Sequence, residues 1–81
     1  MPIHVKLSTT LRRHVPGYEA EKGLTLNLDP GDAPTAADIA TRLGLPHAEI
    51  KFIMLNGRYA ALTAPLKPND RVAFFPAVGG G

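Results

Sequence analysis

The feature that most constrains the fold of this chain is a single stripe of apolar residues at helical spacing. It lies between segments in which apolar and polar residues alternate, as they do in strands. Its apolar residues fall at i, i+3, i+4 and i+7, the spacing of one helix face: Ala36, Ile39, Ala40 and Leu43. Thr35 is a candidate N-cap, and Asp38 three positions later makes a weak version of a capping box. Gly44 suits the left-handed position after a helix, and Pro46 prevents continuation. A chain with one such helix has one helical layer to pack against its strands.

Two strands are predicted before the helix. Residues 3–7 and 24–28 each alternate apolar and polar side chains, the pattern of a strand with one buried face. Between them, roughly from Thr9 to Lys22, lies a segment with a Pro-Gly pair in its middle. This segment is long for a tight hairpin turn, and we expect a mobile loop there.

Three more strands are predicted after the helix. Residues 50–55, IKFIML, form a strong strand pattern that ends at an Asn-Gly turn, and residues 58–62 return as a short partner. A connection that contains prolines leads to the last strand, RVAFFP, over residues 71–76. Pro76 should end that strand because it lacks the N–H that would continue the ladder.

This order of elements predicts the fold class. Two hairpin units separated by one helix, in only 81 residues, leave too little chain for crossovers on both faces of a sheet. We therefore expect an α+β fold of the β-grasp type, with a mixed sheet of four to five strands packed on one helix. The first and last strands pair in parallel at the centre of such a sheet. Residues 1–76 would form the domain, and residues 77–81 a protruding flexible tail.

Composition and spacing argue against several kinds of chemistry. The chain has no cysteine, which excludes disulfides, thiolate metal sites and a cysteine nucleophile. The net charge of +2, with the densest basic group at Arg12, Arg13 and His14, does not indicate nucleic-acid binding. His4 and His47 complete a set of three histidines without metal-ligand spacing, so we expect no metal site. No apolar run could cross a bilayer and no signal-peptide pattern opens the chain, so we expect a cytoplasmic protein without a membrane partner.

Four segments carry a resemblance to a known family: TLRR (10–13), TAADIATRLGLP (35–46), MLNG (54–57) and NDRVAFFPAVGGG (69–81). The chain resembles the small sulfur-carrier proteins related to ubiquitin, in particular the small subunit of molybdopterin synthase and, more distantly, the thiamine-pathway carrier. Synthase small subunits typically end in FFPPV-x-GG. Six residues fall on that pattern: Phe74, Phe75, Pro76, Val78, Gly80 and Gly81. Ala77 departs from the second proline, and Gly79 occupies the variable position.

The resemblance implies a ubiquitin-like carrier that works through Gly80 and Gly81. In this family an E1-like adenylyltransferase uses ATP to make the terminal carboxylate an acyl-adenylate, and sulfur then displaces AMP to give a thiocarboxylate. The large subunit of molybdopterin synthase accepts the tail, and the thiocarboxylate gives sulfur to the precursor of molybdopterin or the related tungsten cofactor. The chain itself would be a non-catalytic carrier that binds no cofactor. It would act as the small subunit of a synthase-type sulfurtransferase.

Three other functions remain open. A thiamine carrier, whose acceptor is thiazole synthase, shares the fold and the terminal Gly-Gly. A ubiquitin-like modifier would join its activated carboxylate to a lysine of another protein. A plain β-grasp interaction module would function without Gly80 and Gly81.

Strand phasing predicts the surface that partner enzymes recognise. If Phe74 and Ile53 point to the helix, three large apolar side chains share the open face beside the tail: Phe52, Met54 and Phe75. His4, Lys6 and Ser8 would border this patch, which is typical of a partner surface. In the reversed phase, Phe52 and Met54 would lie in the core instead. The further partner-binding candidates are Pro76, Val78, Gly79 and, flanking the patch, Arg12.

Overall fold

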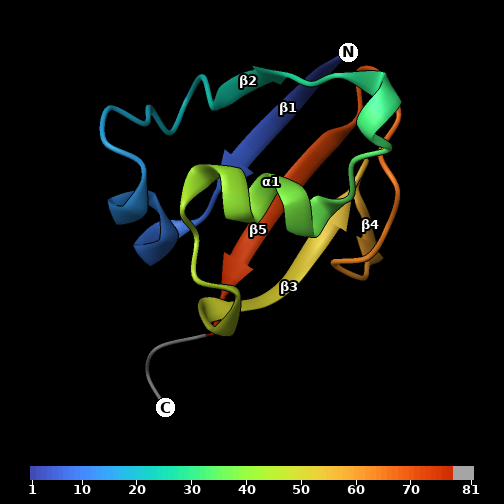
Figure 1. Ribbon diagram of the computed structural model, residues 1–81. Helices are drawn as coiled ribbons and strands as arrows, with labels where there is room; N and C mark the ends of the chain where they lie inside the picture. The colour runs from blue at the N-terminus through green and yellow to red at the C-terminus, as the bar shows by residue number, and fades with distance from the viewer. Residues whose placement is uncertain (78–81) are drawn as a thin grey trace.

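The computed structural model describes residues 1–77 of the chain. Its strands (β), 3-10 turns (η) and single α-helix follow one another in the order shown in Figure 1: β1 (Pro2–Leu7), η1 (Thr9–His14), β2 (Leu24–Asn27), η2 (Pro30–Asp32), α1 (Ala36–Leu43), η3 (His47–Glu49), β3 (Ile50–Leu55), β4 (Arg58–Ala60) and β5 (Arg71–Pro76).

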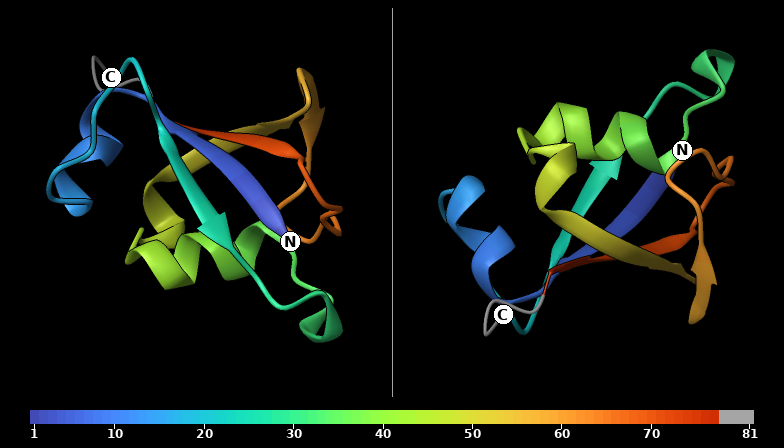
Figure 2. Two further views of the ribbon diagram at one scale, coloured as in Figure 1. Left: turned by 90° about the horizontal axis from the view of Figure 1, so that it is seen from above. Right: turned by 90° about the horizontal axis from the view of Figure 1, so that it is seen from below.

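The five strands form one mixed sheet in the order β2-β1-β5-β3-β4. β1 and β5 pair in parallel at its centre, with His4 opposite Arg71 and Leu7 opposite Phe74, and the other neighbours are antiparallel. Helix α1 crosses one face of the sheet, and in the described part of the chain no helix covers the other face (Figure 2). This is the β-grasp architecture that the order of elements predicts.

Local sequence signals begin and end helix α1 and form the turn between β3 and β4, as expected. Asp38 N donates to Thr35 Oγ1 at 3.4 Å and Thr35 N donates to Asp38 Oδ2 at 2.8 Å, which completes a capping box at the start of α1. Gly44 follows the helix with φ of 75°. Asn56 and Gly57, with φ of 52° and 83°, make the tight turn between β3 and β4.

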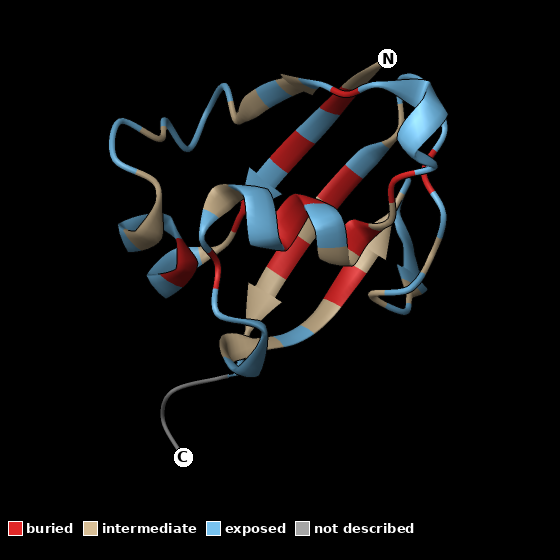
Figure 3. Cartoon of the chain, in the orientation of Figure 1, coloured by how far each residue is buried: buried red, intermediate tan, exposed pale blue. Residues whose placement is uncertain are grey.

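The core lies between α1 and the sheet, where buried positions on the central strands face buried positions on the helix (Figure 3). Phe74 is the largest fully buried side chain. The strand residues around it are Ile3, Val5, Leu7, Ile53 and Val72, and the helix contributes Ala36, Ile39 and Ala40. The alternation seen in the sequence therefore corresponds to one buried and one open face.

The segment after β1 differs from the expected mobile loop. Residues Thr9–His14 form η1, and Leu11 at its centre is fully buried in the core. The backbone of β1 also holds this segment in place, because Leu7 N donates to Tyr18 Oη at 2.8 Å and Leu7 O accepts from Arg12 Nε at 2.8 Å. A 3-10 segment of six residues with a single buried residue has no apolar periodicity, so pattern analysis gives no sign of it.

Two strands are shorter than predicted. β2 ends at Asn27, and Leu28 is buried just beyond it; β4 ends at Ala60 rather than at residue 62. The register of β3 against β5 also shifts between Ile50 and Phe52, which places a bulge next to the end of β5.

Candidate functional site

Strand β5 presents adjacent phenylalanines to opposite faces of the sheet. Phe74 is fully buried beneath α1, whereas Phe75 is only partly buried and lies on the open face. On β3, Ile53 is buried, and Phe52 and Met54 are partly buried on the same face as Phe75. The expected strand phase is confirmed, and the reversed phase is wrong.

Three aromatic rings lie together on the open face. Phe52 and Phe75 are directly opposite each other across β3 and β5, and their rings stack with centroids 4.5 Å apart and planes 11° apart. Tyr59 on β4 adds a third ring, tilted by 59° with its centroid 5.2 Å from that of Phe52. We call Phe52, Tyr59 and Phe75 the aromatic cluster.

Tyr59 is the one member of this cluster that the sequence patterns did not single out. It is 76% exposed, the most exposed large hydrophobic residue of the described part. The sequence did contain a signal for it. The two-residue Asn-Gly turn sets the register that places Tyr59 opposite Met54, on the open face.

A hollow of about 520 Å³ opens beside the aromatic cluster where β5 ends; its walls are Ser8, Thr9, Thr10, Phe52, Phe75, Pro76 and Ala77. We call it the exit hollow, because Pro76 and Ala77 lead the chain away from the sheet. Two of its walls, Phe52 and Phe75, are apolar rings, and three are hydroxyl-bearing residues at the start of η1. Thr9 has φ of 39°, which a β-branched residue rarely adopts, and such strain is typical of functional sites.

The predicted border residues have different surroundings. Ser8 is a wall of the exit hollow. Lys6 extends toward the loop before β2, where its ammonium donates to the carbonyls of Ala20 and Glu21 at 3.3 and 3.0 Å. His4 Nδ1 lies 3.2 Å from Thr25 Oγ1. Lys6 and His4 are therefore exposed side chains on the open face that are anchored toward β2, away from the exit hollow.

Arg12 does not line the exit hollow. Its Nε donates to Leu7 O, and its guanidinium carbon lies 6.0 Å from the centroid of the Tyr18 ring. Arg12 is exposed but held by two contacts, so a part of its role in this fold is to fasten η1 to the end of β1.

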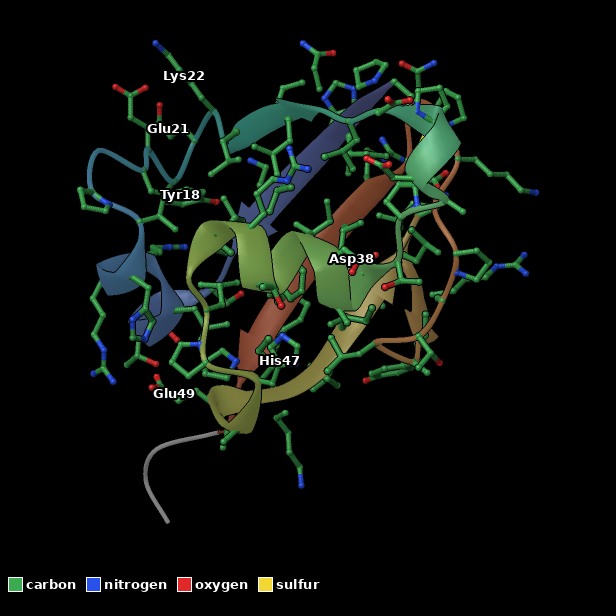
Figure 4. The ribbon with its side chains drawn as sticks, viewed as in Figure 1. Tyr18, Glu21, Lys22, Asp38, His47 and Glu49 are labelled. Atoms are coloured by element: carbon green, nitrogen blue, oxygen red, sulfur yellow. The ribbon has the colours of Figure 1, made fainter. Side chains whose placement is uncertain are left out.

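A charged cluster joins η1 and η3 near the end of β5. Glu49, labelled in Figure 4, lies beside η1. Its Oε1 accepts from Arg13 Nη2 at 3.1 Å and lies 3.0 Å from His14 Nε2. The hydrogen bond from His14, with the charges of His14 and Arg13, holds the pKa of Glu49 below its ordinary value of 4.5, against the opposing effect of desolvation. The next residue, Ile50, pairs with Pro76, so the cluster helps to position the end of β5.

The remaining predicted site residues lie outside the described residues: Val78, Gly79, Gly80 and Gly81. Their roles stay predictions. Within residues 1–77 no three histidine, aspartate or glutamate side chains gather in a way that could hold a metal ion. The same part of the chain has no helix that is both long and apolar enough to cross a membrane.

Comparison with known proteins agrees with this architecture. SAMP1 from Haloferax volcanii is similar over 100% of both chains, with 22% identity and a TM-score of 0.72. A putative molybdopterin converting factor subunit 1 from Pyrococcus furiosus covers 96% of this chain and 99% of its own, with 21% identity and a TM-score of 0.69. A second structure of the H. volcanii protein, small archaeal modifier protein 1, is 24% identical over 95% of this chain and 98% of its own, with a TM-score of 0.68.

At these identities the similar structures show the fold alone. No curated protein matches the sequence significantly. The family assignment comes from the sequence itself, because the ThiS family profile matches residues 14–81, which include β2 to β5 and the glycine-rich end. The chain therefore belongs to the ThiS family, with the ubiquitin-like β-grasp fold.

Proposed function

We propose that this chain is a sulfur carrier whose Gly81 carboxylate is adenylated and converted to a thiocarboxylate, which donates sulfur in molybdopterin biosynthesis. The observation that carries the proposal is the ThiS family match, which extends through Gly80 and Gly81. As a ThiS-family member with this fold, the chain is a sulfur carrier or a ubiquitin-like protein. The molybdopterin pathway and the thiocarboxylate are the more specific steps that need a test.

The proposed chemistry takes place on the carboxyl group of Gly81. A carboxylate oxygen attacks the α-phosphorus of ATP, and pyrophosphate leaves. Sulfide then attacks the acyl carbon, the bond between that carbon and the phosphate oxygen breaks, AMP leaves, and the thiocarboxylate remains. Among residues 1–77, the walls of the exit hollow carry hydroxyl and apolar groups and no titratable side chain. This arrangement suits a carrier that relies on its partner for acid-base chemistry.

Two partner enzymes follow from this chemistry. An E1-like adenylyltransferase would activate Gly81, and the large subunit of a molybdopterin synthase would accept the sulfur. Phe52, Phe75 and the exit hollow support this part of the proposal, because partly buried aromatic rings beside a hollow are typical anchors of a protein interface. In this proposal Pro76, Val78 and Gly79 enter the partner with the tail. Since the activating step consumes ATP, the proposal implies a cytoplasmic location.

A protein modifier is the second candidate. Two of the similar structures are of a protein named as a small archaeal modifier, and a modifier would use the same activated carboxylate. The name of the P. furiosus protein favours the molybdopterin pathway, whereas the family name favours the thiamine carrier as a further alternative. The molybdopterin carrier, the thiamine carrier and the modifier share the activation of the carboxylate. The two carriers differ in the molecule that accepts the sulfur, and the modifier joins its carboxyl carbon to another protein.

The deciding experiment measures intact mass after incubation with the activating enzyme encoded in the same genome, ATP and a sulfide source. We expect a mass increase equal to the replacement of one oxygen by sulfur, and no increase in a variant that lacks Gly81. The thiocarboxylate product is then mixed separately with the large synthase subunit and with thiazole synthase, each with its precursor. Sulfur transfer to the first supports molybdopterin synthesis.

Other results would contradict the proposal. If an activating enzyme that makes the acyl-adenylate never yields the thiocarboxylate, the chain is not a sulfur carrier. Lysine-linked conjugates that form in cells and disappear when Gly81 is deleted would instead support the modifier. Turnover with thiazole synthase alone would assign the chain to the thiamine pathway.

A further inference from the structure

Both neighbours of β5 in the sheet are joined to a short turn near the end of β5. Because β1 runs parallel to β5, η1 follows β1 at that end, and because β3 runs antiparallel, η3 precedes β3 at the same end. Figure 1 shows η1 and η3 near the place where β5 stops. A contact between these turns therefore joins the two strands that flank the end of β5.

Each turn is anchored to its own part of the fold. Leu11 of η1 is fully buried in the core, and Ser8 N, just before η1, donates to Phe74 O at 3.1 Å. His47 of η3 contacts helix α1, with its Nε2 3.1 Å from Thr41 Oγ1. The first turn is thus fixed beside β1 and β5, and the second is fixed to the helix.

Glu49 is the residue that links the two turns. Its Oε1 lies 3.1 Å from Arg13 Nη2 and 3.0 Å from His14 Nε2. Within residues 1–77, these two contacts are the side-chain hydrogen bonds and ion pairs that join η1 to η3. The lowered pKa of Glu49 keeps its carboxylate charged near neutral pH. We call Glu49, Arg13 and His14 the Glu49 bridge.

The residue after Glu49 pairs with the last residue of β5. Ile50 lies opposite Pro76, and the register shift before the next pair leaves Lys51 as the extra residue of a bulge. Pro76 has no N–H to donate to Ile50, and Ile50 N donates to His47 O within η3. The position of this last pair therefore depends on where η3 is held, and the Glu49 bridge holds it.

We infer that the Glu49 bridge fixes the direction in which the chain leaves β5, and that Glu49 is a positioning residue for activation of the Gly81 carboxylate. This inference rests on the proposed function. The five residues after Pro76 span at most about 17 Å. A fixed starting direction limits the region that their carboxyl end can reach, which raises its effective concentration at the ATP of the activating enzyme.

The kinetic test compares Glu49→Ala with Glu19→Ala. Both variants remove one carboxylate and break an ion pair, because Glu19 Oε2 lies 3.2 Å from Lys22 Nζ in the loop before β2. We expect Glu49→Ala to lower the kcat for acyl-adenylate formation by about five- to tenfold. Its KM should stay within about twofold of the wild-type value, because Phe52 and Phe75 remain available to the partner. Glu19→Ala should leave both constants within about twofold of the wild type.

Further variants test whether the bridge acts as a unit. Glu49→Gln keeps an oxygen that can accept from Arg13 but loses the charge, so its kcat should fall between those of the wild type and Glu49→Ala. A variant with both Arg13→Ala and His14→Ala should lose as much kcat as Glu49→Ala. Adding Glu49→Ala to it should cause less than about a twofold further loss. Losses that multiply as for independent sites would overturn the inference.

A direct measurement on the chain end needs no partner. Pro76 has no amide proton, so the amide of Ala77 is the first that reports on the chain after β5. We expect Glu49→Ala to lower the amide heteronuclear NOE of Ala77, and Glu19→Ala to leave it unchanged. An unchanged value at Ala77 in Glu49→Ala, or an equal fall at the core residue Phe74, would overturn the inference.

The mass experiment on the wild type separates this inference from the proposed function. If the activating enzyme makes no acyl-adenylate of the wild type, the sulfur carrier is wrong and so is the role of Glu49 in activation, while the NOE of Ala77 still decides whether the bridge fixes the chain end. If Glu49→Ala is activated with the wild-type kcat, or loses in KM instead, the carrier is correct and the positioning role is wrong.

Discussion

Phe74 and Phe75 are adjacent residues of the same type, yet their side chains have separate tasks. Phe74 fills the core, and Phe75 stacks on Phe52 on the open face. We expect Phe74→Ala to lower the free energy of unfolding by about 3–5 kcal/mol, the usual cost of removing a buried ring. Phe75→Ala should cost about 1 kcal/mol of stability, since it loses one partly exposed ring pair.

Binding should show the opposite order. We expect Phe75→Ala to weaken binding to the activating enzyme by about thirtyfold, as a central aromatic anchor does. Urea unfolding and binding titrations on the two variants give both quantities. A Phe75→Ala protein that is as unstable as Phe74→Ala and still binds normally would mean that Phe75 belongs to the core.

Gly23 is a residue where a glycine is needed for two reasons. Its φ is 66°, and a β-carbon there would lie 2.6 Å from the carbonyl oxygen of Val5. Gly57 is the matched control, because its φ is 83° but a β-carbon would meet no atom within 4 Å. We expect Gly57→Ala to cost about 1–2 kcal/mol from backbone strain alone.

Gly23→Ala should cost about 1–3 kcal/mol more than Gly57→Ala, because the clash with Val5 must also be relieved by moving β1 or the loop. Chemical denaturation of the two variants measures the difference. Equal losses of stability would show that the loop before β2 moves away from β1 without cost.

At the scale of elements, η1 and η3 are joined by Glu49 although 35 residues separate His14 from Glu49. The pKa of Glu49 is lower in the folded chain than its ordinary 4.5, so the unfolded chain binds more protons as pH falls through this range. The Glu49 contribution to stability is therefore present above pH 4.5 and is lost as pH falls through the lowered pKa. Glu49→Gln should melt at a lower temperature than the wild type above that pH, and this difference should vanish in more acidic solution.

Glu21→Gln is the control for that comparison, since Glu21 is exposed in the loop before β2 and the charge change is the same. Melting curves of the three proteins across the acidic range provide the measurement. If the wild type and Glu49→Gln differ by the same amount at every pH, charge on Glu49 does not stabilise the link between η1 and η3.

At the scale of the whole molecule, the domain and its glycine-rich end should be separable. The buried core of the described part ends at Phe74. We therefore expect deletion of Gly80 and Gly81 to change the melting temperature by no more than about 1 °C, while thiocarboxylate formation is lost completely. Truncation after Val72, which removes Phe74 from the core and residues 73–76 from the central strand β5, should prevent folding. A marked loss of stability on deletion of the two glycines would show that they contact the domain.

Much of this architecture follows from local sequence. The helix with its capping box, the Asn-Gly turn and the phase of β3 and β5 each depend on residues a few positions apart, so pattern analysis can find them. The phase then places Phe52, Met54 and Phe75 on one face. The parallel pairing of β1 with β5 follows once the order of elements is known, because few connections of these elements bury one helix face on one sheet.

The sequence by itself therefore determined the fold class and the faces of the strands. Only the tertiary structure decided that Leu11 completes the core, that Thr9 and Thr10 form a wall of the exit hollow, and that Glu49 meets His14. The physical reason is distance along the chain. Periodicity shows which side of its own helix or strand each residue occupies. The contacts of η1 and η3 depend instead on where these two short turns pack against the sheet, and residues far away in the sequence determine that position.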